Sequence, residues 1–241
     1  MSFKTLFGTD SDPLTGYPSD RITTRDGGEI RISFFKHASL AITIDNLHTI
    51  YIDPVDQYAD YARLPKADLV VVTHSHYDHL DIQAIEKIED EHTTIICDHT
   101  SAAAFSGNCI EMRPGKTNTP REYIHIEGVA AYNTSEGHRQ FHPREREDCG
   151  YVLTISGTRI YIAGDGEPTE EMMALKNIDI AFLPVNQPYT MTVDQAVGVV
   201  KQLKPRIFYP YHYGEVDEKT DIDRLARELK LVTDIRIRPM K

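Results

Sequence analysis

Side chains that bind metal ions are concentrated at residues 73–79, which read Thr-His-Ser-His-Tyr-Asp-His. His74 and His76 are two residues apart, so in an extended segment their side chains project to the same side and can share one ion. Asp78 and His79 follow at an expected turn and can serve a second ion nearby. Imidazole and carboxylate groups together suit zinc, and also manganese or iron. Because the chain holds 11 histidines among 241 residues, a chance cluster is a poor explanation, and the segment predicts a metal site.

The run Leu-Val-Val-Val at residues 69–72 comes directly before this segment and has the pattern of a strand buried on both faces. A loop at the end of such a strand is where a rigid scaffold usually carries functional side chains. Other short runs rich in β-branched and aromatic residues predict strands at 29–35, 40–44, 49–52, 94–97, 123–126, 129–132, 151–155, 159–163, 180–183, 207–209 and 234–237. Glu127-Gly128 separates the strands at 123–126 and 129–132 in this interpretation.

Helical patterns alternate with these strands. Apolar periodicity predicts helices at 81–89 and 222–229, with a short Ala-rich helix near 101–105. Thr192 and Gln195 form a capping-box pattern that opens a further helix. Residues 1–28, rich in turn-forming types, are expected to be an irregular N-terminal arm, and residues 29–241 a single domain. Strands interspersed with helices favour two sheets packed face to face with helices outside.

The formal net charge of −11 indicates which classes of partner the protein can bind. Nucleic-acid backbones are bound mainly by neutralising them with Lys and Arg, so this balance argues against a general nucleic-acid binder. Bound divalent cations would offset part of the negative charge. The sequence holds no run of about 18 apolar residues and no N-terminal signal pattern. We therefore expect a cytoplasmic protein without membrane insertion that acts on a small molecule, and a homo-oligomer is compatible with this expectation.

The segment at 73–79 resembles the HxHxDH signature of the metallo-β-lactamase superfamily. Three further features occur in the order that this resemblance implies. Asp53, in Tyr-Ile-Asp-Pro, looks like the strand-end aspartate that precedes the signature. Asp165, in Ala-Gly-Asp, looks like the carboxylate that bridges two metals, and His212 looks like the final histidine. The resemblance implies an α/β (α+β) fold, an αββα sandwich of two mixed sheets with helices outside.

The resemblance also implies a dinuclear site with two divalent ions, zinc being favoured over manganese or iron. The implied ligands are His74, His76, Asp78, His79, His142, Asp165 and His212, and Asp78 and Asp165 are the expected catalytic residues. The third histidine of the first ion is open between His142, His138 and Asn133. His142 is favoured because Phe-His-Pro restricts the backbone, and His138 is expected to face solvent.

Other residues are expected around the ligands. His37, Asp53, Asn133, Tyr189 and Tyr213 are candidates for substrate contacts or for holding the ligands, and Asp53 would fix the tautomer of a ligand histidine. Tyr189 and Tyr213, and with them Tyr211, have an equally good alternative in hydrophobic packing. The remaining histidines, His48, His92, His99 and His125, are expected at the surface or in packing roles.

Such a site predicts a metal-dependent hydrolase in which a metal-activated hydroxide attacks an ester-type bond. The chain looks most similar to the branch of ascorbate-6-phosphate lactonase and N-acyl-phosphatidylethanolamine phospholipase D, which implies a lactone or a phosphodiester of a small molecule. The alternatives are a nuclease of the same fold, a flavodiiron-like redox protein and a non-catalytic metal-binding protein. The redox alternative is disfavoured because its signature has Glu where His76 stands.

Overall fold

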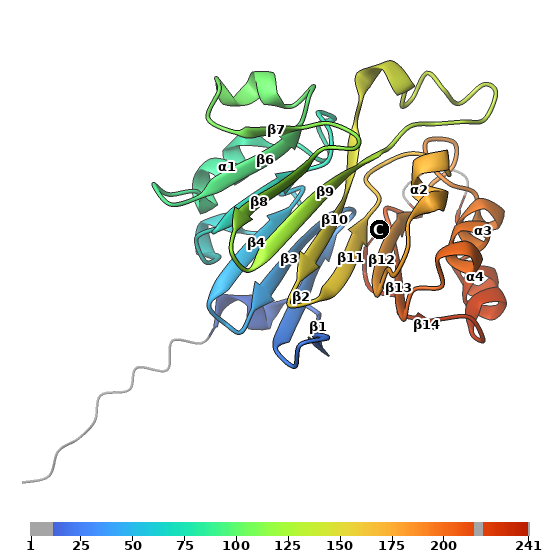
Figure 1. Ribbon diagram of the computed structural model, residues 1–241, viewed down its shortest axis with the longest axis horizontal. Coiled ribbons are helices and arrows are strands. Elements are labelled where there is room, and N and C mark those ends of the chain that lie inside the picture. Colours follow the sequence, from blue (N-terminus) through green and yellow to red (C-terminus); the bar gives the residue numbers. More distant parts are fainter. Residues whose placement is uncertain (1–11, 215–218, 241) are drawn as a thin grey trace, which may run out of the picture.

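The computed structural model describes residues 12–214 and 219–240. Two seven-stranded sheets form its centre (Figure 1). In the first sheet the strands lie in sequence order: β1 (Ser19–Thr23), β2 (Glu29–Lys36), β3 (Ser39–Ile44), β4 (His48–Ile52), β5 (Leu69–Val72), β6 (Thr94–Asp98) and β7 (Ile110–Met112). The second sheet contains β8 (Thr117–Arg121), β9 (Ile124–Ala130), β10 (Cys149–Ile155), β11 (Thr158–Ile162), β12 (Ile180–Pro184), β13 (Ile207–Tyr211) and β14 (Asp234–Ile235).

Both sheets are mixed and have the same plan. Strands β1 to β4 pair antiparallel and β4 to β7 pair parallel. Likewise, β8 to β11 pair antiparallel and β11 to β14 pair parallel. The parallel half of each sheet brings the carboxyl ends of several strands to one edge, which is where ligands bind in such sheets.

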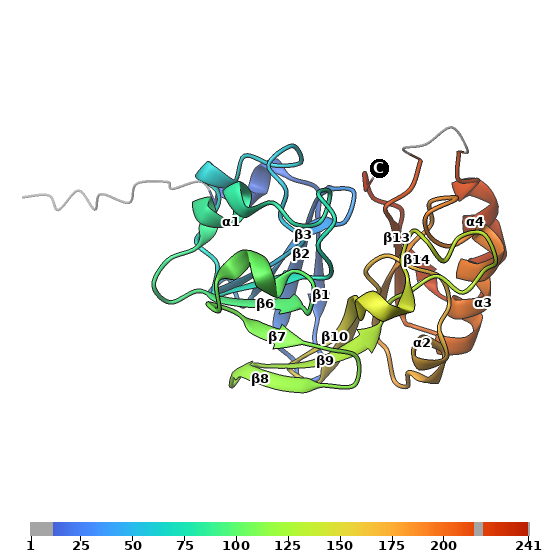
Figure 2. The same cartoon turned by 90° about the horizontal axis from the view of Figure 1, so that it is seen from above.

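Helices cover the outer faces of the sheets. α1 (Ile82–Ile88) lies beside the first sheet, and α2 (Glu170–Ala174), α3 (Val193–Leu203) and α4 (Ile222–Leu229) lie on the side of the second (Figure 2). Four short 3-10 helices complete the described elements: Pro13–Gly16, Tyr61–Arg63, Ala102–Phe105 and Arg144–Arg146. The predicted αββα sandwich is therefore confirmed.

Hydrophobic burial explains the layers. One apolar cluster fills the space between the sheets and continues under α3 and α4, and it includes Ile32, Phe34 and Tyr209. A second cluster, with Tyr51 and Ile85, packs α1 against the outer face of the first sheet. Strand β5 contributes to both clusters because its side chains alternate between the faces of the sheet. The continuous apolar run at 69–72 is thus a strand buried on both faces, as predicted.

The capping box predicted before α3 is present. The Thr192 side chain accepts a hydrogen bond from the backbone N–H of Gln195, and the Gln195 side chain accepts one from the backbone N–H of Thr192. Two donors that the first helical turn leaves unpaired are satisfied in this way. The helix therefore starts at a defined residue, and the loop before it is anchored at its end.

Two expectations about local structure are corrected. Residues 19–23 form β1, so the predicted irregular arm through residue 28 contains a strand; residues 1–11 of the arm lie outside the described part of the chain. The predicted break at Glu127-Gly128 does not exist, because β9 runs through it. A Cβ on Gly128 would lie 2.5 Å from the carbonyl oxygen of Arg113, so glycine is required for a close backbone approach and not for a turn. Strands β7 and β8 and helix α2 were not predicted from the sequence.

No helix among the described residues combines the length and the apolar character needed to cross a bilayer.

Candidate metal centre

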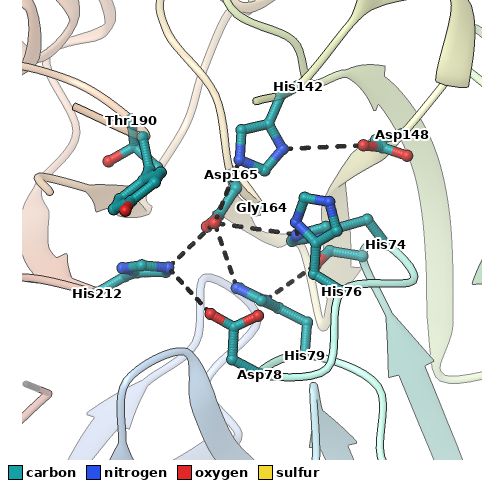
Figure 3. Close-up of polar contacts among 12 residues, drawn as sticks. His74, His76, Asp78, His79, His142, Asp148, Gly164, Asp165, Thr190 and His212 are labelled. Atoms are coloured by element: carbon teal, nitrogen blue, oxygen red, sulfur yellow. Dashed lines mark hydrogen bonds and ion pairs between the residues drawn. The ribbon is translucent and has the colours of Figure 1, made fainter. Parts of the chain in front are cut away.

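The ends of several strands bring the predicted ligands to one edge of the sandwich. Residues 74–79 follow β5, Asp165 follows β11, and His212 follows β13. His142 lies on the long loop between β9 and β10. The close-up shows these side chains converging from both sheets on one point (Figure 3). The structure thus brings together residues that lie up to 138 positions apart, from His74 to His212.

The Asp165 carboxylate lies at the centre of the histidines. Its Oδ2 atom is 3.0 Å from Nε2 of His212, 3.4 Å from Nε2 of His79 and 3.6 Å from Nε2 of His142. The Nε2 atom of His74 lies 3.9 Å from the same oxygen. Asp165 is 4% exposed, so this carboxylate is shared among four imidazoles in a buried position.

The donor atoms fall into groups whose members lie within 4.8 Å of one another. One group contains His74, His76 and His142. A second contains Asp78, His79 and His212, together with His37. Asp165 joins His74 and His79 in a third group and so stands between the other two. Two imidazole-rich groups connected by a carboxylate are the arrangement that the signature implied.

The choice among three candidates for the first group favours His142. Its side chain is 2% exposed and lies with those of His74 and His76. Asn133 instead donates through Nδ2 to the backbone carbonyl oxygens of His138 and Tyr189, at 3.0 and 2.8 Å. Through its amide nitrogen Asn133 therefore holds the loop.

His138 does not simply face solvent, as the sequence had suggested. Its side chain is 29% exposed, and its Nδ1 atom lies 3.1 Å from Oε1 of Glu167. Glu167 is 1% exposed and also accepts hydrogen bonds from the backbone N–H groups of Thr134 and Ser135. His138 thus belongs to the contacts by which Glu167 orders the loop that carries His142.

Asp53 contacts both ends of the segment 73–79, which carries four of the candidate ligands. Its Oδ2 atom lies 2.8 Å from Nδ1 of His79, and its Oδ1 accepts a hydrogen bond from the backbone N–H of Thr73 at 2.8 Å. With the proton on Nδ1, the Nε2 atom of His79 is left to point at the donor groups. Asp53 is fully buried, as expected for a carboxylate that orients a ligand histidine.

Burial and neighbouring charges both shift the pKa values of the buried groups, in the same direction for His74 and in opposite directions for the two carboxylates. Burial and the neighbouring charge of His79 hold the pKa of His74 well below its usual value. Burial alone would raise the pKa of Asp165, but the electrostatic interactions and hydrogen bonds with His212 and His79 outweigh it and hold this pKa well below the usual range. Burial likewise opposes ionisation of Asp78, whereas the hydrogen bond to His37 and the charge of His79 bring its pKa down to about 2. Both carboxylates are therefore ionised and need positive charge beside them.

One buried atom at the centre of the site fits a cation in particular. Oδ1 of Asp165 has no hydrogen-bond partner among the described residues. A buried polar atom without a partner is costly, and such atoms usually mark a bound water, an ion or a catalytic role. Neutral imidazole nitrogens and carboxylate oxygens are the donors that Zn²⁺ prefers, so the residues present fit divalent ions of this kind.

His37 lies against the second group. Its Nε2 atom is 3.2 Å from Oδ2 of Asp78, and its ring centroid is 3.6 Å from that of His212. Both His37 and His212 have positive φ, at 57° and 48°. Such conformations are uncommon outside glycine and cluster at functional sites, where the surrounding structure holds them.

Comparison with known proteins agrees with this geometry. The sequence profile described as the Beta-lactamase superfamily domain matches residues 31–212. The UPF0173 metal-dependent hydrolase of Thermoplasma volcanium is 31% identical over 200 residues, which cover 78% of this chain and 86% of the relative. The chain belongs to the metallo-β-lactamase superfamily. It is a metal-dependent hydrolase of that superfamily.

Solved structures are similar to this hydrolase along most of its length. A crystal structure described as that of a metal-dependent hydrolase from Parabacteroides distasonis has a TM-score of 0.87 at 47% identity, and the match covers 93% of this chain and 100% of that one. A metallo hydrolase from Ignicoccus hospitalis has a TM-score of 0.73 at 22% identity, covering 88% and 96%, and shows the shared fold.

The hydrolase has an open cavity of about 740 Å³ above the donor groups. Tyr189, a predicted substrate-contacting residue, lines it, as do His37 and Asp78. Tyr213 is corrected: it is 3% exposed within the apolar core, where its hydroxyl donates to the backbone carbonyl of Arg238. Tyr211 is also buried and donates to the carbonyl oxygen of Gly164 at 2.8 Å, which fixes the turn before Asp165.

Sequence reasoning missed three polar residues of the hydrolase. Asp148, 2% exposed, lies 3.9 Å from Nδ1 of His142 and pairs with Arg146 at 2.9 Å. Asn186 lies with its side-chain amide nitrogen 3.1 Å from Nδ1 of His212. Glu167 orders the loop that carries His142. No motif marks these residues. Glu167 and Asn186 contact partners that are distant in the sequence, whereas Asp148 contacts His142 and Arg146 within the same loop.

Proposed function

We propose that His74, His76 and His142 hold one divalent cation, that Asp78, His79 and His212 hold a second, and that Asp165 bridges the two. The observation that carries this proposal is the place of Asp165 Oδ2, within 3.0–3.9 Å of a nitrogen from each of four histidines in both donor groups. Zinc is the ion favoured by this donor set, and manganese and iron are alternatives.

The reaction that this arrangement supports best is hydrolysis of an ester-type bond in a small molecule. When bound, the cations lower the pKa of water towards ~7 and stabilise the negative charge that develops on a carbonyl or phosphoryl oxygen. The low pKa of Asp78 keeps its carboxylate able to accept a hydrogen bond from the attacking water and so to orient it. His37, at 3.2 Å, holds that carboxylate in place.

The outer contacts set which nitrogen of each histidine is available. Asp53 accepts the Nδ1 proton of His79 and so leaves Nε2 available for a cation. If Nε2 of His212 binds a cation, its Nδ1 carries the proton and needs an acceptor. Asn186 then presents its amide oxygen, in place of its amide nitrogen, to Nδ1, which corresponds to a 180° rotation of the amide group.

The lactonase and phospholipase-like branch suggested by the sequence belongs to this proposal, since both chemistries cleave ester-type bonds. The experiment is to purify the protein, measure its metal content, and assay it against carboxylic esters, lactones and phosphodiesters with and without a chelator. We expect turnover that the chelator removes and zinc restores. Turnover that is unaffected by metal removal would contradict the proposal.

A further inference from the structure

The cavity at the donor groups is lined partly by aromatic side chains and by no described Lys or Arg. Beyond the ligand candidates and His37, the side chains that line it are Ser75, Tyr77, Gln140, Phe141, Asn186 and Tyr189. At about 740 Å³ the cavity has the size of a small-molecule site. Three of the six side chains are aromatic, and none of the described lining residues is Lys or Arg.

Two of the aromatic rings form a pair from different loops. Phe141 lies on the loop between β9 and β10, and Tyr189 on the loop between β12 and α3. Their ring centroids are 4.9 Å apart with an interplanar angle of 72°. Tyr189 is 39% exposed, and Tyr77 on the ligand segment is 84% exposed. Large apolar side chains exposed together around a cavity indicate a surface that a ligand covers.

The aromatic pair is tied to the metal ligands by Asn133. The amide of Asn133 donates to the carbonyl oxygen of Tyr189 at 2.8 Å, and its backbone N–H donates to the carbonyl oxygen of His142 at 2.9 Å. Asn133 is 2% exposed, so these bonds are shielded from water. Phe141 precedes His142 directly. The apolar wall is therefore held at a fixed distance from the proposed metal site, as a substrate pocket requires.

The charges near the wall disfavour an anionic substrate. The guanidinium of Arg146 reaches Ser75 through Nη2 at 3.0 Å, but its Nε lies 2.9 Å from Oδ2 of buried Asp148, which compensates its charge. Phosphate and carboxylate groups are usually recognised by Arg or Lys with uncompensated charge. A charged group packed against Phe141 and Tyr189 would therefore lose water without gaining a cationic side chain as a partner.

We infer that the substrate is an uncharged carboxylic ester or lactone whose acyl part carries an apolar chain or ring that packs on Phe141 and Tyr189. This inference rests on the proposed function. In the reaction, the oxygen of water bonds to the carbonyl carbon, and the carbon–oxygen bond of the ester breaks. The leaving oxygen keeps the electron pair and takes up a proton. The products are a carboxylic acid and an alcohol, or one hydroxy acid from a lactone, and no oxidant or reductant is consumed.

The test compares matched substrates on the zinc-loaded protein. Ethyl hexanoate and monoethyl adipate have acyl chains of equal length, but the second ends in a carboxylate; ethyl acetate lacks the chain. We expect kcat/KM for ethyl hexanoate to exceed that for each of the other two by about tenfold or more. Bis(4-nitrophenyl) phosphate, the phosphodiester probe, should be the poorest substrate. Equal or faster turnover of monoethyl adipate would overturn the inference.

Substitutions of Phe141 and Tyr189 test whether these two rings cause the preference for an apolar acyl chain. Phe141→Ala and Tyr189→Ala should each reduce the ratio of kcat/KM for ethyl hexanoate to that for ethyl acetate, with metal content unchanged. Leu231→Ala, which removes a side chain that is 92% exposed and is not among those lining the cavity, is the control and should leave the ratio unchanged. An unchanged ratio in both wall variants would contradict the assignment of the apolar group to these rings.

The outcomes also distinguish a wrong substrate class from a wrong proposed function. Efficient cleavage of the phosphodiester with no ester turnover would reject the inference and leave the proposed metal-dependent hydrolysis standing. Absence of turnover for every substrate by a protein that holds no metal would reject the proposed function itself.

Discussion

The backbone N–H of His212 donates a hydrogen bond to the carbonyl oxygen of His37 at 3.1 Å, and the rings of the two residues lie 3.6 Å apart between centroids. His37 is in the turn between β2 and β3 of the first sheet, whereas His212 follows β13 of the second. The contact therefore joins the two sheets at the site. The second donor group takes His79 from the first sheet and His212 from the second, so it can form only when the two sheets are packed together.

Replacement of His37 by Ala tests the importance of this contact for metal binding. Removing the imidazole leaves Asp78 without the group that holds its carboxylate at 3.2 Å, so we expect metal affinity at the second group to fall about 10- to 100-fold. Isothermal titration of the metal-free protein with zinc measures the change. His48→Ala, at the start of β4, is the matched control, and a His37→Ala protein that binds zinc as tightly as this control would refute the role given to His37.

His142 and His138 offer a direct comparison within one loop. His142→Ala removes a nitrogen from the first donor group. Loss of a residue that only hydrogen-bonds to a ligand typically lowers metal affinity about 10- to 100-fold, and we expect a larger loss here. His138→Ala removes only a contact with Glu167 and should have a small effect on activity. Metal content and kcat for the two variants provide the measurement. The reverse ranking would assign the third ligand to His138.

Asp20 predicts a pH-dependent contribution to stability. Burial alone would raise its pKa, but hydrogen bonds from Tyr209, at 2.6 Å, and Arg238, at 2.7 Å, outweigh burial and lower it. Because the folded-state pKa is lower than the unfolded value of about 3.9, the contribution is complete above that value and is lost as the pH falls below it. Asp20→Asn should cost about 1–2 kcal/mol at pH 7, allowing for partial exposure.

Urea unfolding of the metal-free protein at several pH values, with chelator present throughout, measures this contribution. The difference between Asp20→Asn and the unmodified protein should shrink towards zero below about pH 4. Glu122→Gln, at an exposed position, is the control for a change of charge alone. A difference that stays constant with pH would show that the Asp20 carboxylate stabilises the fold by packing and not by its charge.

The accuracy of prediction from sequence differs between residues for physical reasons. The strand before His74 and the helix after Thr192 were predicted because their signals, an apolar run and a capping box, are local. Gly128 was misread because a glycine required by the Arg113 carbonyl looks the same in sequence as one required by a turn. The contacting atoms lie on a segment that is separate in sequence and adjacent only in the fold.

The same distinction holds within the site. His74, His76, Asp78 and His79 are close in sequence, so their grouping in space could be predicted from spacing alone. Tyr213 was a candidate both for the pocket and for hydrophobic packing, and its side chain enters the core. The φ of 48° at His212 ends the extended backbone of β13, so the direction of the next side chain cannot be read from spacing in the sequence.

The number of bound metal ions is the sharpest test of a site in which Asp165 joins two cations. Elemental analysis of the purified protein after zinc loading and removal of free metal should find about two ions per chain, because two donor groups share the Asp165 carboxylate. The Asp165→Ala variant, in which two cations would repel each other without a bridge, should hold at most one and lose hydrolysis. Two tightly bound ions in both proteins, or none in either, would contradict the account.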